Sequence, residues 1–333
     1  MRICVLGCGS IGLRHLRNLS AAGFHDLVGY DPDEARLKDV GQAVPARCVP
    51  TLDEVWQSRP DIAFITGPPS AHVHLALAAA ERGCHLFIEK PLADTPVGLP
   101  QLLPMVTERR LITMVGCNMR FHPGPAKVKE LIVRQMIGKL LFARIYAGSY
   151  LPAWRPGSDY RKSYSARRSL GGGCLLDCIH EIDLARWYLG EVEEVTCVAG
   201  RVSSLEIDTE DVAALICRHE SGALSEIHLD YVQRAYDRGC RIAGEDGAIS
   251  WDFVNGATRC YDAATGEWEC YSEPAGYEIN QMYVDELSHF LDCVRNERET
   301  CFPVGEACSV MQIVFAAKQS AECRRSVPIK GVL

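Results

Sequence analysis

A lysine stands directly at the end of a predicted buried strand. The segment 85–88, His-Leu-Phe-Ile, has the composition of such a strand, and Glu89, Lys90 and Pro91 follow it without a gap. Because proline cannot continue a central strand, the chain must turn at Pro91. Ligands of open parallel sheets bind just beyond the carboxyl ends of the strands, so the Lys90 amine would lie at the reactive end of a bound cofactor. A surface Lys–Glu pair beside a turn is the alternative interpretation.

An aspartate and a histidine form a second candidate group. The glycines of segment 171–173 precede a predicted helix that carries Asp177 and His180, and glycines allow a backbone to approach a ligand closely. Residues three apart share a helix face, so Asp177 could orient the His180 imidazole or raise its basicity. An imidazole is suited to taking a proton from an alcohol at neutral pH. The alternative is a helix-capping glycine run before a buried structural histidine.

The N-terminal residues have the pattern of a dinucleotide site. The segment 7–12, Gly-Cys-Gly-Ser-Ile-Gly, lies between a predicted strand and a predicted helix, which is the context that a G-x-G-x-x-G motif requires. Gly7 would allow a tight turn, Gly9 the approach of a pyrophosphate, and Gly12 close packing of helix on strand. The free N–H groups at the helix start would face the phosphates. A plain strand–helix turn is the alternative.

An acidic residue stands where the adenosine ribose would bind. Asp31 comes nineteen residues after Gly12, at the end of the predicted strand 27–30, which is the place of the carboxylate that binds the ribose hydroxyls. Asp33 adds a second negative charge, and neither position holds an arginine. Because a 2′-phosphate would be repelled, the sequence favours NAD over NADP.

Predicted strands and helices alternate up to about residue 120. Residues 1–120 are therefore expected to form a Rossmann domain, an α/β unit with a doubly wound parallel sheet. A loop over residues 66–72 follows a predicted strand and would line the nicotinamide ribose, although His72 is equally well interpreted as a structural histidine at a helix start. The predicted cofactor contacts are Gly7, Gly9, Ser10, Ile11, Gly12, Asp31, Thr66, Pro68, His72, Glu89 and Lys90.

The pattern changes in residues 121–333. Long strand-like stretches follow one another without intervening helices, and two helices end the chain near residues 281–298 and 305–323. This order predicts an α+β domain with a large, mostly antiparallel open sheet that binds substrate. Helices on one side leave the other face of such a sheet in need of cover, so we expect a homodimer or homotetramer formed through this C-terminal sheet.

An irregular segment over residues 150–173 is strongly basic. Its cations, Arg155, Arg161, Lys162, Arg167 and Arg168, outnumber the single acid Asp159, in a chain whose net charge is −8. Long loops inside compact domains are often functional. Either this is a substrate loop for an anion, such as a carboxylate or a nucleotide-sugar diphosphate, or it is a solvated charged loop. The predicted substrate contacts are Arg120, Trp154, Arg155, Tyr160 and Arg161.

Composition excludes several classes of function. The chain has 35 basic and 43 acidic residues, which argues against a nucleic-acid or membrane-surface partner. No apolar run approaches the length of a membrane span, and the first residues are strand-like, so a cytoplasmic protein is expected. The sixteen cysteines are scattered without a Cys-x-x-Cys pair and are interpreted as small core residues. Cys174, Cys178 and His180 lack a second ligand pair, so no metal site is predicted.

Taken together, these residues resemble the Gfo/Idh/MocA family, which includes glucose–fructose oxidoreductase and inositol dehydrogenase. The shared marks are Gly7-x-Gly9-x-x-Gly12, Glu89-Lys90-Pro91, Asn118-x-Arg120-Phe121 and Gly171-Gly172-Gly173-x-Leu175-x-Asp177-x-x-His180-x-x-Asp183. The resemblance spans essentially the whole chain. It implies an NAD(P)-dependent oxidoreductase that acts on a secondary hydroxyl of a sugar, nucleotide-sugar or cyclitol, in carbohydrate or surface-sugar metabolism.

The resemblance also assigns roles. Lys90 would bind the reacting oxygen, His180 would be the acid/base, and Asp177 would support them. Many members place the histidine four residues after the aspartate, whereas the gap here is three, so which of the two carries the proton stays open. Two other functions remain: an NAD-using glycoside hydrolase of the same family, and a non-catalytic NAD-binding protein.

Overall fold

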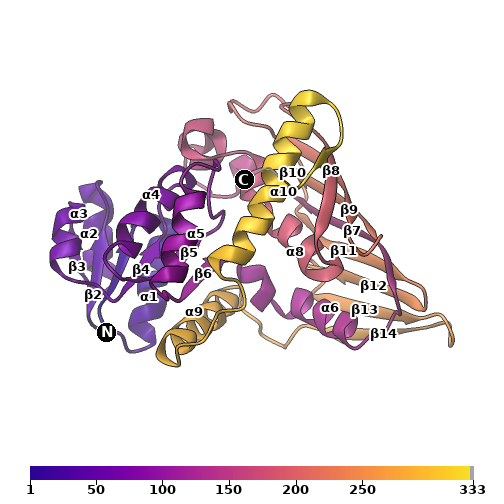
Figure 1. Ribbon diagram of the computed structural model, residues 1–333, viewed down its shortest axis with the longest axis horizontal. Helices are drawn as coiled ribbons and strands as arrows, with labels where there is room; N and C mark the ends of the chain where they lie inside the picture. Colours follow the sequence, from indigo (N-terminus) through magenta and orange to yellow (C-terminus); the bar gives the residue numbers. More distant parts are fainter. Residues whose placement is uncertain (331–333) are drawn as a thin grey trace. The chain divides into compact units, whose positions relative to one another are not determined.

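The computed structural model describes residues 1–330, which form two compact units (Figure 1). The first unit contains residues 1–118 and 279–309, and the second contains residues 119–278 and the chain from 310 onward. The segment 279–309 joins the first unit through β6 (Thr113–Gly116): the Thr300 hydroxyl donates to the Thr113 carbonyl over 2.6 Å. The division expected from the sequence, at residue 120 alone, gave this segment to the second part.

The first unit is built on a six-stranded sheet in the order β3-β2-β1-β4-β5-β6, and every pair in it is parallel. Its central strands are buried runs of apolar residues, as strands covered on both faces must be. The doubly wound sheet predicted from the sequence is therefore confirmed. The strands are β1 (Ile3–Leu6), β2 (Leu27–Tyr30), β3 (Arg47–Val49), β4 (Ile62–Ile65), β5 (His85–Glu89) and β6.

Several helices of this unit begin soon after a strand ends and pack on the sheet. Strand order reverses between β1 and β4, and ligands of such sheets bind at this point. Helix α9 packs against α1 and β6, and its Phe290 lies edge-on to Phe64 and Phe87, which stack with ring centroids 4.7 Å apart. The helices are α1 (Ser10–Ala21), α2 (Glu34–Ala43), α3 (Leu52–Gln57), α4 (Pro69–Ala80), α5 (Leu99–Glu108) and α9 (Asn280–Arg295).

The second unit contains a nine-stranded sheet in the order β14-β13-β12-β11-β7-β10-β9-β8-β15. Among the described residues of this second sheet, only the β7–β10 pair is parallel. The predicted, mostly antiparallel sheet is therefore confirmed. The sequence pattern missed β14, whose polar residues are mostly exposed, and the two-residue β15. The strands are β7 (Leu140–Gly148), β8 (Val192–Gly200), β9 (Val212–His219), β10 (Leu224–Asp230), β11 (Asp237–Gly244), β12 (Gly247–Asp252), β13 (Ala257–Asp262), β14 (Glu267–Ser272) and β15 (Val327–Pro328).

The two faces of this sheet differ. Helices α6 (Pro123–Val133) and α8 (Ile179–Leu189) pack on one face. Ser320 of α10 (Val304–Cys323) accepts a hydrogen bond from the Cys197 N–H of β8 over 2.9 Å. On the opposite face, the strand register pairs Phe142 with Leu224 and places Ile216 diagonally between Leu224 and Val198. The Val198, Ile216 and Phe142 side chains are 75%, 50% and 39% exposed.

The segment 150–173 is more ordered than its sequence pattern suggested. It folds into four short 3₁₀ turns: Leu151–Ala153, Tyr160–Lys162, Tyr164–Ala166 and Arg168–Leu170. The helix predicted after it is interrupted, because Cys178 leaves the helical region with φ −93° and ψ 34°. Asp177 therefore ends α7 (Cys174–Asp177), whereas His180 lies in the first turn of α8, and the prediction that they share one helix face is wrong.

Twelve of the sixteen cysteines are buried and all sixteen are free thiols; Cys270, Cys301 and Cys323 are exposed. Within residues 1–330, no three His, Cys, Asp or Glu side chains come together as metal ligands would. None of the helices in the same residues combines the length and hydropathy that crossing a membrane requires.

Candidate active site

The glycine-rich loop after β1 leaves room for a ligand at one glycine and for nothing at the other two. Gly7 has φ +106°, and a Cβ there would lie 2.6 Å from the Gly67 nitrogen. A Cβ at Gly12 would collide with the Gly7 carbonyl oxygen. A Cβ at Gly9 would have no atom of the described residues within 4 Å. Gly7 and Gly12 thus serve close packing, and Gly9 borders the open space that a pyrophosphate needs.

The start of α1 faces this space. Gly9 is its N-cap, no side chain of the described residues caps it, and Ser10 and Ile11 form its first turn, with Ser10 exposed. Uncapped N–H groups and the helix dipole together favour a phosphate here. Thr66 supports the loop from β4, because its hydroxyl donates to the Gly7 carbonyl over 2.7 Å, and Pro68 is the N-cap of α4.

Asp31 follows β2 and is almost fully buried. Its carboxylate accepts the Cys8 N–H over 2.8 Å and the Asp33 N–H over 2.9 Å. Arg36 reaches Asp31 at 3.3 Å and Asp33 at 3.6 Å. Two carboxylates and one guanidinium leave a net negative charge where the adenosine ribose would bind. The sequence pattern did not indicate Arg36.

Lys90 is half-buried and comes directly after β5. The preceding carboxylate, Glu89, is 6% exposed and lies 2.7 Å from Nε2 of the fully buried His15 of α1. This pairing connects β5, which ends directly before Lys90, to α1, which begins at the glycine-rich loop. Glu89 was predicted as a cofactor contact, and this geometry favours a supporting role.

A second carboxylate lies buried beside Glu89. Glu286 of α9 is fully buried, and neither carboxyl oxygen has a hydrogen-bond partner among residues 1–330. Burial, with a smaller contribution from the Glu89 charge, raises the pKa of Glu286 well above its ordinary value. An unpaired charge there would be costly, so burial favours the protonated, neutral form of the Glu286 carboxyl.

His72 of α4 does not present its ring to open space. The side chain is buried, its Nδ1 lies 2.7 Å from the Pro91 carbonyl oxygen, and its Nε2 lies 2.9 Å from the Gly67 carbonyl oxygen. Both ring nitrogens are therefore occupied by the backbone. This favours the structural interpretation of His72 over direct contact with a cofactor.

In the second unit, Asp177 is the centre of a group of hydroxyls. Its carboxylate accepts from Tyr164 over 2.6 Å, from Ser165 over 2.6 Å and from Tyr231 over 3.2 Å. Burial, with the nearby Asp177 charge, raises the pKa of Tyr231 well above its usual range, so this phenol remains a donor. Three hydroxyl donors on one carboxylate favour an anchoring role for Asp177 over that of a proton carrier.

His180 stands at the start of α8 and is 6% exposed. The next residue, Glu181, pairs with Arg238 over 2.6 Å, and both are largely shielded from water. The glycines before this region do structural work: a Cβ at Gly172 would strike the Tyr164 carbonyl oxygen, and one at Gly173 the Glu210 carboxylate. Close backbone packing therefore explains Gly172, and a φ of +113° together with the neighbouring carboxylate explains Gly173.

The predicted substrate contacts divide into two sets. Arg120 makes two hydrogen bonds to Asp183, at 2.7 and 2.9 Å, in a buried pair that favours a structural role. The Trp154 ring lies 5.3 Å from Tyr231, and the Arg155 guanidinium lies 5.8 Å from the Tyr164 ring. Trp154 and Arg155 thus adjoin the two tyrosines that bind Asp177.

Two arginines of the basic segment 155–168 bind residues of a later loop. Arg161 pairs with Asp159 at 2.8 Å and with Glu206 at 2.9 Å. The Glu206 N–H donates to the Tyr160 hydroxyl over 3.2 Å. The Arg168 N–H donates to the Asp208 carboxylate over 2.6 Å, and its guanidinium binds the Asp208 carbonyl. Carboxylates therefore neutralise Arg161, whereas the Arg168 guanidinium is held by a backbone carbonyl oxygen.

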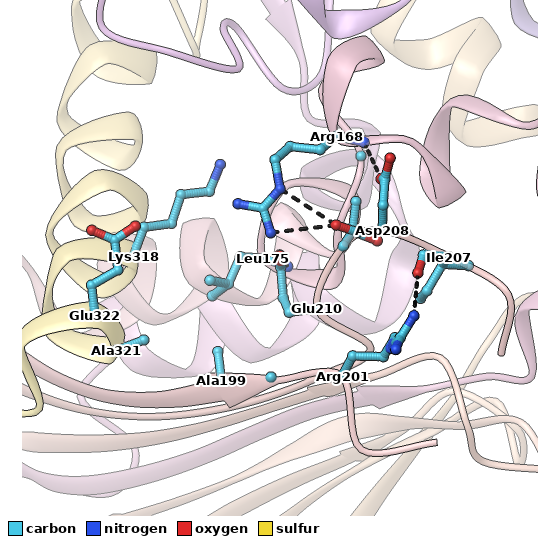
Figure 2. A pocket seen from close by; sticks show the side chains of 13 residues that line it. Arg168, Leu175, Ala199, Arg201, Ile207, Asp208, Glu210, Lys318, Ala321 and Glu322 are labelled. Carbon is cyan, nitrogen blue, oxygen red and sulfur yellow. Dashed lines mark hydrogen bonds between the residues drawn. The ribbon is translucent and has the colours of Figure 1, made fainter. Parts of the chain in front are cut away.

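Figure 2 shows a cavity of about 340 Å³ within the second unit, and its wall contains both basic and acidic side chains. Arg168 and Lys318 extend toward each other from the 3₁₀ segment and from α10. The charged side chains of its wall are three bases, Arg168, Arg201 and Lys318, and three acids, Asp208, Glu210 and Glu322.

Several of these partners have no signal in the sequence. Tyr164, Ser165 and Tyr231 lie 13, 12 and 54 residues from Asp177, and no motif singles them out. Lys90 belongs to the first unit and His180 to the second. Their joint action on one substrate stays a prediction.

Comparison with known proteins agrees with the fold and the glycine loop. Residues 1–117 match a family model described as an oxidoreductase family with an NAD-binding Rossmann fold, and residues 126–250 match the GFO/IDH/MocA C-terminal domain. Myo-inositol 2-dehydrogenase of Thermotoga maritima is 28% identical, and the match covers 100% of both chains.

Two further proteins extend the likeness. The scyllo-inositol 2-dehydrogenase (NAD(+)) of Bacillus subtilis strain 168 is 26% identical over 99% of this chain and 96% of its own. The structure of levoglucosan dehydrogenase in complex with NADH and L-sorbose superposes with a TM-score of 0.89 at 20% identity, covering 100% of this chain and 99% of that one. The chain belongs to the Gfo/Idh/MocA family and is an NAD-dependent oxidoreductase, as its sequence predicted.

The glycine loop gives a matched pair of variants. Gly12→Ala should lower the free energy of unfolding by about 1–3 kcal/mol, because the new methyl meets backbone. Gly9→Ala should leave thermal unfolding nearly unchanged yet weaken NADH binding at least about tenfold, because its methyl enters the space for the pyrophosphate. Denaturant titration and NADH fluorescence measure the two effects. Equal NADH affinity in Gly9→Ala and the wild type would contradict the cofactor placement.

The buried acid predicts a pH dependence of stability. Because Glu286 keeps its proton in the folded chain above the pH at which it ionises in the unfolded chain, rising pH favours unfolding, by at most about 1.4 kcal/mol per pH unit. Glu286→Gln removes this contribution, so the free energy of unfolding of the variant, relative to that of the wild type, should increase from about pH 5 to pH 8. Urea titrations at both pH values test this, with Asp285→Asn at the exposed neighbouring position as control. A parallel pH dependence of wild type and Glu286→Gln would show that Glu286 is ionised when folded.

Proposed function

We propose that this protein is a dehydrogenase that transfers hydride between NAD and a secondary hydroxyl of a neutral cyclitol or sugar. The observation that carries the choice of a neutral substrate is that two guanidinium groups are engaged within the protein: Arg161 pairs with Asp159 and Glu206, and Arg168 binds the backbone carbonyl of Asp208. A loop built to bind a diphosphate or carboxylate would keep its guanidinium groups available. The sequence alone had left an anionic sugar open.

The relatives support the same substrate class. The two curated relatives above are named for oxidation of inositols, which are neutral rings of secondary hydroxyls. None of the relatives named above is described as a glycosidase or as a non-catalytic protein, so neither of the two other hypotheses gains support. NAD rather than NADP is favoured because Asp31 and Asp33 outnumber Arg36 where a 2′-phosphate would lie.

The mechanism assigns one task to each residue. NAD⁺, when bound, supplies the acceptor for the hydride of the substrate carbon. The Lys90 ammonium binds the substrate oxygen and stabilises the negative charge that develops there. His180 takes the hydroxyl proton. Asp177, held by three hydroxyl donors, keeps Tyr164 and Tyr231 in place beside Trp154 and Arg155, which adjoin the substrate.

A spectrophotometric screen tests this proposal. NADH formation is followed with inositols and free sugars as neutral substrates, and with uronic acids and UDP-sugars as anionic ones, each with NAD⁺ and with NADP⁺. We expect turnover on the neutral set with NAD⁺. Lys90→Met should reduce kcat by roughly 10²–10⁴ while NADH binding persists.

Three outcomes would contradict the proposal. Preference for the anionic set would restore residues 155–168 as an anion site, and faster turnover with NADP⁺ would remove the argument from Asp31. Full activity of Lys90→Met would end the assignment of Lys90. Release of an aglycone without net NADH formation would identify a hydrolase instead.

We also propose that the chain forms a homodimer or homotetramer through the face of the nine-stranded sheet that lies opposite to α6 and α8. Val198, Ile216, Leu224 and Phe142 lie on that face and are between 37% and 75% exposed. A cluster of apolar side chains on neighbouring strands is typical of a protein interface.

A charge placed in this cluster should dissociate the assembly. Ile216→Glu is expected to shift the protein to monomer at micromolar concentration, because a buried carboxylate at an interface costs several kcal/mol. Val254→Glu is the matched control, since Val254 is 62% exposed in a turn away from the cluster. Light scattering after size exclusion gives the masses. A wild-type monomer would refute the proposal, and an unchanged Ile216→Glu assembly would place the interface elsewhere.

A further inference from the structure

The backbone after β4 and the backbone after β5 are joined through one side chain. His72 lies 2.9 Å from the carbonyl oxygen of Gly67, which follows β4, and 2.7 Å from that of Pro91, which follows β5. Pro91 is the residue after Lys90. Gly67 in turn lies against Gly7, whose φ of +106° leaves no room for a side chain there. His72 is therefore the link between the Lys90 turn and the glycine-rich loop.

Both partners of the ring are acceptors. A neutral imidazole carries one N–H, and its other nitrogen presents a lone pair. A lone pair within 3 Å of a carbonyl oxygen is repelled, so only a ring with two N–H groups makes both bonds.

We propose that His72 is a positioning residue for Lys90, and that it acts as an imidazolium whose two N–H groups clamp the Gly67 and Pro91 carbonyls together. The proposal rests on the role of Lys90 in the proposed function. A displacement of about 1 Å in a catalytic group can cost roughly a hundredfold in rate, which is the reason for such a clamp.

The surroundings of the ring act in both directions. Burial is the largest influence and holds the pKa of His72 below its ordinary value, although the hydrogen bonds to Pro91 and Gly67 and the charges of Glu89 and Asp94 oppose it. The carboxylates thus face the ring from β5 and from the turn that follows it. The repulsion that a neutral ring would suffer from the second carbonyl opposes the effect of burial and favours the charged ring.

The chain offers a matched control in the same helix. His74 stands two residues after His72 in α4, is exposed, and has been assigned no part in the site. The variants are His72→Asn, His72→Gln and His74→Asn in the full-length protein.

Nuclear magnetic resonance of the ¹⁵N-histidine-labelled wild type tests the clamp without a variant of uncertain stability. The His72 signals are identified by their loss in His72→Asn, or in His72→Gln if the first does not fold. At neutral pH we expect both ring nitrogens of His72 to be protonated and slow to exchange with water, unlike those of His74. One protonated and one bare nitrogen would overturn the proposal.

Kinetics test the effect on Lys90. His72→Asn and His72→Gln should lower kcat by roughly 10–10², with the Kd for NADH within about twofold of the wild type, and His74→Asn should change neither. Wild-type kcat in a folded His72 variant would overturn the proposal. So would a fall in kcat that His74→Asn reproduces.

The outcomes separate this inference from the function on which it rests. If Lys90→Met is fully active, the assignment of Lys90 fails, and the clamp has nothing to position. If Lys90→Met is inactive while the His72 variants keep full kcat, only the clamp fails.

Discussion

The parallel register of β1, β4 and β5 is the constraint on which the first unit depends. Leu6 pairs with Ile65, and Ile65 pairs with Ile88, so three strands end at one level and release their chains side by side. The residues that follow are Gly7, Thr66 and Glu89. Every contact described among them, from the Thr66 hydroxyl on the Gly7 carbonyl to the His72 bridge, requires that common level. Parallel pairing brings sequence-distant loops together without any local signal.

Buried polar groups hold the strand ends where apolar packing cannot specify a geometry. His15 pairs with Glu89 among the rings of Phe64 and Phe87, and Asp177 gathers three hydroxyls in the second unit. Hydrogen bonds have preferred directions, whereas hydrophobic contacts do not. Each of these groups lies beside a residue assigned to chemistry, Lys90 in one case and His180 in the other. Their cost in desolvation is offset by the rigidity that they give to the site.

The sequence predicted those features that local constraints determine. The glycine loop was predictable because Gly7 and Gly12 meet backbone within their own turn and the next strand end, and strand–helix alternation follows from hydrophobic runs. Three features were not. The break at Cys178 is a single residue leaving the helical region. The acids at 206 and 208 lie about forty residues from Arg161 and Arg168, to which they are hydrogen-bonded. Glu286 reaches Glu89 only because α9 returns to the first unit, and no periodicity in either segment indicates that return.

The distribution of thiols gives each unit of this chain natural labelling positions. Burial raises the pKa of the thiols of Cys4 and Cys174 well above the ordinary value and that of Cys217 to about 12, which makes them slow nucleophiles. Cys301 is exposed in the first unit, and Cys270 and Cys323 are exposed in the second. Maleimide dyes would therefore modify both units at defined points without engineered cysteines. Energy transfer between them would report any rotation of one unit against the other as nucleotide is added.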